Sequence, residues 1–107
     1  MNSVQVMGNL ARDPVIRATK TGRAVASFTV AVNRNYTTPQ GEQKELTDWI
    51  NVVAWGNLAE SVGNQLKKGM RVFVEGRLST RSYDTPEGQR RWVTEVVANF
   101  VALPLGN

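Results

Sequence analysis

The side chains best suited to recognise a ligand are aromatic and basic ones, which fall on predicted strands and in the loops between them. Nucleic-acid bases stack on aromatic rings, while arginine and lysine contact phosphates, and neither contact depends strongly on base sequence. This mixture is typical of proteins that bind single strands of nucleic acid. Its members are Trp49, Trp55, Tyr36, Tyr83, Arg34, Lys44, Arg77 and Arg81.

Both of the first two residues lie in Asp48–Trp55, a stretch whose alternation has the period of a β-strand. Its even-numbered positions after Asp48 are apolar and are predicted to face the core. Its odd-numbered residues, Trp49, Asn51, Val53 and Trp55, must then share the opposite face. An indole ring is costly to leave in water, so the two tryptophans are either covered by a partner chain or kept as a platform for a flat ligand. We favour the platform.

The other aromatic residues are weighed differently. Stacking and burial stay open as alternatives for Tyr36 and Tyr83. Trp92 stands beside two arginines, but the pattern does not fix the inward face of its strand, and for it we favour burial in a subunit interface or at an end of the barrel. Phe28 and Phe100 are predicted to be core residues.

The sequence offers little for catalysis or metal binding. It contains no cysteine and no histidine, which removes thiol nucleophiles, thiolate zinc sites and the usual general base. Its nine carboxylates are scattered, and Glu42, Glu45 and Asp48 lack the spacing of a calcium loop. We therefore expect no enzyme, no metal site and no cofactor.

Length and charge narrow the possibilities further. The chain of 107 residues is long enough for one domain and too short for two, so residues 1–107 are expected to form a single domain. Thirteen Lys and Arg against nine Asp and Glu give a net charge of +4, which fits either an anionic partner or a merely soluble basic surface. The sequence has no signal-peptide pattern and no apolar run near the roughly 20 residues of a membrane span, so we expect a cytoplasmic protein.

Hydrophobic periodicity predicts five strands and one helix. The strands cover Ser3–Leu10, with a short continuation at Val15–Ala18, then Ala24–Arg34, Glu45–Trp55, Met70–Arg81 and Gln89–Leu103. The helix is expected over Leu58–Lys67 with Asn57 as its cap. One helix between the third and fourth of five strands is the element order of an all-β OB-fold, a Greek-key barrel. A five-stranded sandwich is the alternative.

Smaller patterns add detail to this fold. The segments Tyr36–Gly41 and Tyr83–Gly88 share the sequence Tyr-x-Thr-Pro-x-Gly, which predicts two hairpin tips built alike. Leu78 is predicted to point inward. Apolar residues that the alternation places outward, such as Met7, Val53 and Phe73, would need a partner surface to cover them.

A series of short motifs runs through the chain in order. They are Met7-Gly8-Asn9-Leu10 with Asp13-Pro14, Thr47-Asp48-Trp49, Val52-Val53 with Gly56 and Leu58-Ala59-Glu60, Lys68-Gly69, Val74-Glu75-Gly76 and Thr94-Glu95-Val96. This series resembles the bacterial single-stranded-DNA-binding protein family over essentially the entire chain. The resemblance implies an OB barrel, a homotetramer, and binding of single-stranded DNA without sequence preference during DNA replication, recombination and repair, in the cytoplasm at the nucleoid.

The resemblance also implies roles for individual residues. Trp49 and Trp55 match the family's stacking aromatics on the third strand, although phenylalanine is common at the second position, and Tyr36 and Tyr83 fall where tryptophan is often found. The basic positions of the family's DNA-contacting surface match Arg17, Lys44, Lys68 and Arg81. Asn51 and Asn57 depart from the family pattern, because a basic residue is frequent at both positions.

The expected protein partners depend on the end of the chain. Family members usually continue into a Gly- and Pro-rich linker with a short acidic tip that recruits replication and repair proteins, and no such acidic tail follows in this sequence. We expect either an isolated DNA-binding domain or a natural short form. A replication accessory protein that acts through protein contacts and an RNA-binding OB domain stay open as other functions, and Trp49 and Trp55 favour DNA binding over the first of them.

Overall fold

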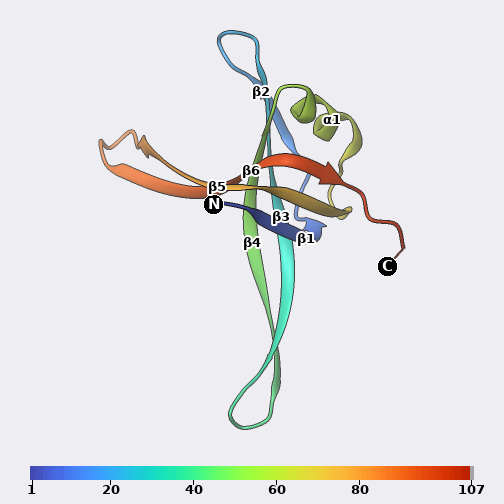
Figure 1. Ribbon diagram of the computed structural model, residues 1–107. Helices are drawn as coiled ribbons and strands as arrows, with labels where there is room; N and C mark the ends of the chain where they lie inside the picture. The colour runs from blue at the N-terminus through green and yellow to red at the C-terminus, as the bar shows by residue number, and fades with distance from the viewer. Residues whose placement is uncertain (107) are drawn as a thin grey trace.

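Residues 1–106, the part of the chain that the computed structural model describes, form six strands and one helix (Figure 1). The strands are β1 (Val4–Leu10), β2 (Val15–Ala18), β3 (Ala24–Thr37), β4 (Gln43–Trp55), β5 (Arg71–Asp84) and β6 (Arg90–Ala102), and the helix α1 covers Asn57–Gln65. Every predicted strand is present. β3, β4 and β5 extend further into the hairpin loops than the sequence pattern indicated.

The strands join into one sheet in the order β1-β5-β6-β4-β3-β2. The sheet closes because β1 also pairs with β3, through Asn9 with Ala31 and Leu10 with Val30. A closed barrel of β1, β3, β4, β5 and β6, with α1 between its third and fourth strands, is the predicted OB-fold, and its closure excludes the sandwich. β2 does not continue β1 but pairs antiparallel with the first residues of β3.

Alternating side chains from the barrel strands fill the core, and α1 adds Ala59 and Val62, followed by Leu66 just after the helix ends. Burial of such side chains is the main favourable contribution to folding. The buried cluster consists of Leu10, Ala26, Phe28, Val30, Val52, Ala54, Ala59, Val62, Leu66, Val72, Val74, Val96 and Ala98. The prediction of Phe28 as a core residue is confirmed.

Two buried glycines mark places where strands cross closely. A Cβ atom on Gly8 would collide with the carbonyl oxygen of Ala31, and one on Gly76 would collide with that of Val97. The barrel can therefore keep its tight closure only while both positions lack a side chain.

Phe100 is not a core residue, so that prediction is wrong: its side chain is 54% exposed. The pairing of β5 with β6 shifts between Glu75 and Gly76, which pair with Phe100 and Ala98 respectively. The extra residue in β6 reverses the alternation beyond this point and turns Phe100 outward. There its ring meets that of Phe73 edge-on, with 6.3 Å between ring centroids.

The predicted orientation is also wrong for two other apolar residues. Val53 was expected outside but is only 7% exposed, because it pairs with Val97 of β6 and is covered where the two hairpins meet. Leu78 was expected inside but is 48% exposed. The pairing of β1 with β5 ends at Gly76, so Leu78, which pairs only with Val96 of β6, lies where β5 leaves the barrel and is not covered by β1.

The helix differs from the prediction at both ends. Gly56, with φ of 65°, takes the cap position, no side chain caps the helix, and Asn57 is its first residue. Asn57 is therefore not the cap. The helix ends at Gln65, because Leu66 is already extended, and Lys67 lies outside it. Within residues 1–106, no helix is long and apolar enough to cross a membrane.

Three hairpin arms leave the barrel, and their tips are built alike (Figure 1). At the β3–β4 tip, the Gly41 N–H donates to the Thr38 carbonyl at 2.9 Å and the Glu42 N–H donates to Thr38 Oγ1 at 3.0 Å. The same two bonds recur from Thr85 at the β5–β6 tip and from Thr19 at the β2–β3 tip. The predicted likeness of the β3–β4 and β5–β6 tips is confirmed. The β2–β3 tip has the same hydrogen bonds, although its sequence contains no proline.

Candidate nucleic-acid interface

The outer face of β3 and β4 carries both predicted tryptophans of the platform. Trp49 is 63% exposed and Trp55 36%. Their cross-strand neighbours are Ala31 and Val25, which are small enough to leave the indole rings clear of the sheet. Two aromatic rings on one face of one hairpin are thus accessible to a flat ligand.

A groove of about 440 Å³ borders Trp55, between the β3–β4 hairpin and the β5–β6 hairpin. The parallel pairing of β4 with β6 brings the two hairpins together at this point. The groove combines apolar valines with one aromatic ring and two arginines. Its lining residues are Val25, Val53, Trp55, Arg77, Ser79, Arg81, Glu95 and Val97. A base stacked on the indole would therefore have guanidinium groups nearby for its phosphate.

Arg81 is held within this groove by an ion pair. Its Nε donates to Glu95 Oε1 at 2.9 Å, and the side chains are 58% and 14% exposed respectively. Because this bond uses Nε, it leaves the two Nη groups of Arg81 available to a further acceptor. A guanidinium fork oriented in this way suits a phosphate oxygen.

β5 continues the same surface away from the barrel. Arg77, Arg81 and Tyr83 are separated by even numbers of residues, so they share one face of the strand. Tyr83 is 50% exposed and pairs with Arg91 of β6. The β5–β6 arm therefore extends the groove with another aromatic ring and another basic residue.

The β2–β3 arm contributes on the other side of Trp55. Arg17 pairs with Val25, and Val25 pairs with Trp55, so the three residues form one row across three strands. Arg23 lies over the indole itself, with Cζ 4.9 Å from the ring centroid of Trp55. Sequence analysis did not single out Arg23, because its closeness to Trp55 follows only from the pairing register of β3 with β4.

Residues 1–104 match the model of the Single-strand binding protein family. The chain belongs to this family. It is 52% identical over 101 residues to the Single-stranded DNA-binding protein of Halalkalibacterium halodurans and 50% identical to Single-stranded DNA-binding protein A of Bacillus subtilis. These alignments cover 94% of this chain but only 59% and 58% of the two relatives. The chain therefore spans less than two thirds of their length.

A solved structure has the same fold. It is the Plasmodium falciparum SSB in complex with ssDNA, which superposes with a TM-score of 0.84 at 30% identity and covers 95% of this chain and 91% of that one. The family membership and this likeness agree with the resemblance that the motifs indicated.

Three predicted site residues of this family member lie away from the groove, on the β3–β4 arm. Side chains at even-numbered positions of β3 and β4 point to the core side of the sheet, and those at odd-numbered positions, such as Trp49, point to the other side. Even numbers, and hence the face opposite Trp49, apply to Tyr36, Arg34 and Lys44. This odd or even numbering is called parity. Tyr36 is 41% exposed. Both basic residues are in exposed ion pairs, Arg34 with Asp48 at 3.1 Å and Lys44 with Glu42 at 3.3 Å.

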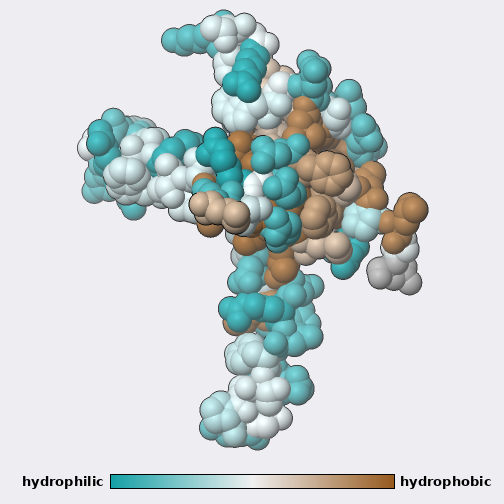
Figure 2. All heavy atoms as spheres, in the orientation of Figure 1, coloured by the Kyte–Doolittle hydropathy of each residue, from teal (hydrophilic) through white to brown (hydrophobic). Residues whose placement is uncertain are grey.

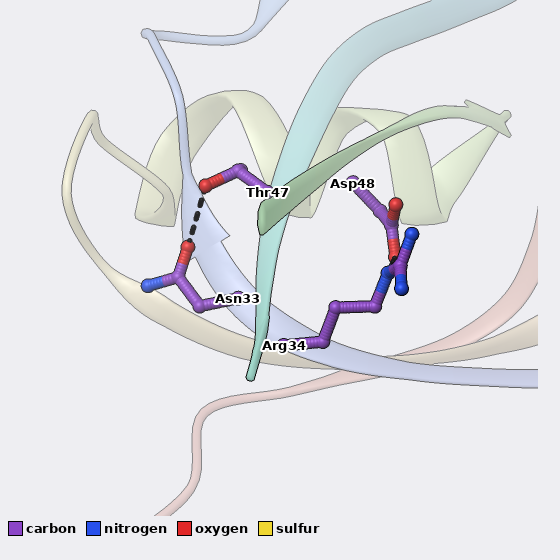
Figure 3. A network of polar contacts seen from close by, with 4 residues as sticks. All are labelled: Asn33, Arg34, Thr47 and Asp48. Carbon is purple, nitrogen blue, oxygen red and sulfur yellow. Dashed lines mark hydrogen bonds and ion pairs between the residues drawn. The ribbon is translucent and has the colours of Figure 1, made fainter. Parts of the chain in front are cut away.

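Figure 3 shows the two sides of this arm. The hydroxyl of Thr47 donates to Asn33 Oδ1 at 2.9 Å on one side, and Arg34 meets Asp48 on the other. Thr47 and Asn33 share the parity of Trp49, so polar side chains continue the tryptophan face along the arm. Asn51, between the tryptophans, accepts a hydrogen bond from the Thr29 hydroxyl at 3.3 Å.

Lys68 lies in the loop after α1. It is exposed, and its backbone N–H donates to Asp13 Oδ1 at 2.8 Å. The next residue, Gly69, accepts a hydrogen bond from Asn9, which pairs with Ala31 beside Trp49. Asn9, Ala31 and Trp49 form one row across β1, β3 and β4, and Lys68 lies near the Asn9 end of this row. It is not part of the groove lining.

Trp92 is the most exposed of the tryptophans, at 68%. Burial at an end of the barrel is therefore wrong for Trp92, whereas burial in a subunit interface stays a prediction. It pairs with Ser82, and its parity places it on the face of the β5–β6 arm opposite Tyr83. Within residues 1–106, no group of three or more His, Cys, Asp or Glu could hold a metal ion.

Proposed function

We propose that the chain binds single-stranded DNA without sequence preference and catalyses no reaction. The observation that carries this proposal is the groove in which Trp55 lies beside Arg77 and Arg81. Bases stacked on aromatic rings and phosphates bound to arginine give affinity without reading base edges. The names of the relatives and the ssDNA in the Plasmodium falciparum complex support the same function.

The proposed contacts divide into a groove set and an outlying set. The groove set runs from the β2–β3 arm to the β5–β6 arm: Trp55, Arg77 and Arg81 line the groove, and Arg17, Trp49 and Tyr83 lie on the strand faces that continue from it. The outlying set consists of Tyr36, Arg34, Lys44 and Lys68, which a strand would reach only by continuing over the β3–β4 arm or the loop after α1. We propose that the first set dominates the binding of short strands.

The biological role follows from this activity. As one binding domain, the chain would cover exposed single strands during DNA replication, recombination and repair, in the cytoplasm at the nucleoid. Replication and repair proteins are the proposed protein partners.

Titration with oligo-dT tests the proposal. Stacking on Trp49 and Trp55 should quench tryptophan fluorescence, and a duplex of the same length should quench far less. The logarithm of the affinity should fall with the logarithm of the salt concentration, with a slope of about −0.7 per contacted phosphate. No quenching, or a flat response to salt, would contradict the proposal. Competition by an oligo-U of equal length separates DNA from RNA preference.

We also propose that the chain assembles as a homotetramer. Figure 2 shows apolar residues gathered over the barrel, whereas the arms are hydrophilic. Met7 on β1 and Phe100 on β6 are 44% and 54% exposed, and Phe73 between them on β5 meets Phe100 edge-on. β1 pairs with β3 only at Asn9 and Leu10, so the edge of its first residues is also open to a partner strand.

Light scattering at micromolar concentration tests this assembly. A mass near four times 11.8 kDa is expected for the intact chain. Replacing Phe100 with aspartate should dissociate the assembly, because a charge would be buried in an apolar contact. A monomer for the unaltered chain would contradict the proposal.

A further inference from the structure

We infer that Arg23 is a positioning residue for Trp55. Its guanidinium covers one face of the indole ring and leaves the other face to a base in the groove. The inference rests on the proposed function, because the ligand concerned is a nucleobase of single-stranded DNA. It starts from the contact already described, with Arg23 Cζ 4.9 Å from the ring centroid of Trp55. A guanidinium over an indole ring is attracted by the electrons of the ring.

Backbone hydrogen bonds place the main chains of both partners. The Arg23 N–H donates to Thr19 Oγ1 at 3.0 Å, and its carbonyl accepts from the Thr19 N–H at 2.8 Å. Trp55 pairs with Val25 in the ladder, and the following Gly56 N–H donates to the Ala24 carbonyl at 2.9 Å. These bonds hold the two backbones beside each other, so the Arg23 side chain starts within reach of the ring, and the attraction between guanidinium and indole selects the orientation in which they meet.

Arg23 lies on the side of Trp55 away from the groove. It precedes Val25 by two residues and therefore shares its face, toward the tip of the β2–β3 arm. Trp55 lines the groove together with Arg77 and Arg81, whereas Arg23 does not line it. The indole ring thus stands between a cation on one side and an open groove on the other.

The chemistry of Arg23 fits this role. Among residues 1–106, its guanidinium is in no ion pair with a carboxylate, so its interaction with the ring is not weakened by a competing anion. A ring held in one orientation loses less freedom when a base stacks on it, which favours binding. The alternative role is a direct phosphate contact, which would make Arg23 one more basic residue of the path.

The two roles can be separated in a chain that keeps only one tryptophan. In the Trp49→Phe, Trp92→Phe background, the fluorescence reports on Trp55 alone. Arg23→Gln removes the guanidinium, and Arg23→Lys keeps a cation over the ring. Arg12→Gln is the matched control, because Arg12 is an exposed arginine that makes no cation–π contact within the described residues.

The first measurement needs no DNA. Quenching of Trp55 by acrylamide should increase in Arg23→Gln, because the covered face becomes accessible, and should stay unchanged in Arg23→Lys and Arg12→Gln. The second measurement is oligo-dT affinity. Arg23→Gln should weaken it by about two- to fivefold more than Arg12→Gln, with an unchanged salt slope, and Arg23→Lys should recover most of the loss.

Other results would overturn the inference. A salt slope reduced by about 0.7 in Arg23→Gln would make Arg23 a phosphate contact. Affinity equal to that of Arg12→Gln would deny it any special role, and tighter binding would mean that it blocks the ring. Absence of oligo-dT binding by the unaltered chain would instead refute the proposed function, so the two failures are distinguishable.

Discussion

The β3–β4 and β5–β6 arms begin from nearly the same tip sequence, with a tyrosine two residues before the threonine that builds the turn. Tyr83 has the parity of Arg77 and Arg81, which line the groove, whereas Tyr36 has the parity of the core residues Phe28 and Val30. The local sequence sets the turn. The sequence separation between the core and the tip decides which face the tyrosine occupies, because it is even from Val30 to Tyr36 and odd from Val74 to Tyr83.

One ion pair from each arm shows a similar difference, although the β5–β6 arm also carries an exposed pair between Arg90 and Asp84. Arg34 and Asp48 are 55% and 46% exposed on the face of the β3–β4 arm away from the groove. Arg81 instead pairs with Glu95, which is only 14% exposed and lies in the groove itself. An exposed pair contributes little to stability and can open readily, whereas a half-buried carboxylate keeps its partner in one orientation.

The largest effect is expected at Trp55, where the two arms meet. Trp55→Ala should weaken oligo-dT binding by about 5- to 150-fold, because stacking of one base contributes ~1 to 3 kcal/mol. Trp49→Ala should weaken it within the same range. Trp92→Ala is the matched control on the far face of the β5–β6 arm and should change the affinity by less than about twofold. Circular dichroism should show the same fold in all three variants.

Unchanged affinity in both Trp49→Ala and Trp55→Ala would end the stacking assignment. A loss in Trp92→Ala as large as that in Trp55→Ala would mean that the strand also covers the opposite face of the β5–β6 arm.

The next effect separates the two tyrosines. Tyr83→Ala should reduce the affinity for a short oligo-dT about fivefold, and Tyr36→Ala less than about twofold, because only Tyr83 continues the groove. With a longer oligo-dT the difference should narrow, since a longer strand can reach the β3–β4 arm. Fluorescence anisotropy of labelled oligomers measures both. If both variants lost the same affinity for the short oligomer, the proposal that only the β5–β6 arm contacts short strands would be wrong.

The sequence predicted the barrel because alternation, the single helical stripe and the turn residues all pointed to one fold. Two of the errors fall where a distant strand intervenes. Phe100 lies beyond a register shift that only the pairing of β5 with β6 reveals, and Val53 is covered where the β5–β6 hairpin meets β4.

The candidate site was predictable to a similar extent. Residue type singled out Trp49 and Trp55 because exposed indoles are unusual. Type alone could not separate Tyr36 from Tyr83, since they occupy equivalent places in like sequences. The role of Arg23 could not be predicted, because its contact with Trp55 depends on the pairing register of β3 with β4, which the sequence pattern does not determine.

A smaller effect is expected from removing one carboxylate of each arm. Glu95→Gln should strengthen oligo-dT binding by about two- to fivefold, because a negative charge near the bound phosphates costs on the order of 1 kcal/mol at about 4 Å. Asp48→Asn removes the same charge outside the groove and should change the affinity by less than about twofold. Titrations at low salt measure both. Weaker binding by Glu95→Gln would mean that orienting Arg81 matters more than the charge.

The smallest effect concerns the tips, where the two arms should behave identically. Thr38→Val and Thr85→Val each remove the side-chain acceptor of one backbone N–H, those of Glu42 and Gln89, at 3.0 and 3.1 Å. A hydrogen bond of this kind contributes about 0.5 to 1 kcal/mol, so each variant should lower Tm by about 2 to 8 °C. Calorimetry should give equal shifts for the two variants, and short oligo-dT should bind both as it binds the unaltered chain. If Thr85→Val alone weakened binding, the β5–β6 tip itself would contact the strand, and the difference between the arms would extend beyond the face on which each tyrosine lies.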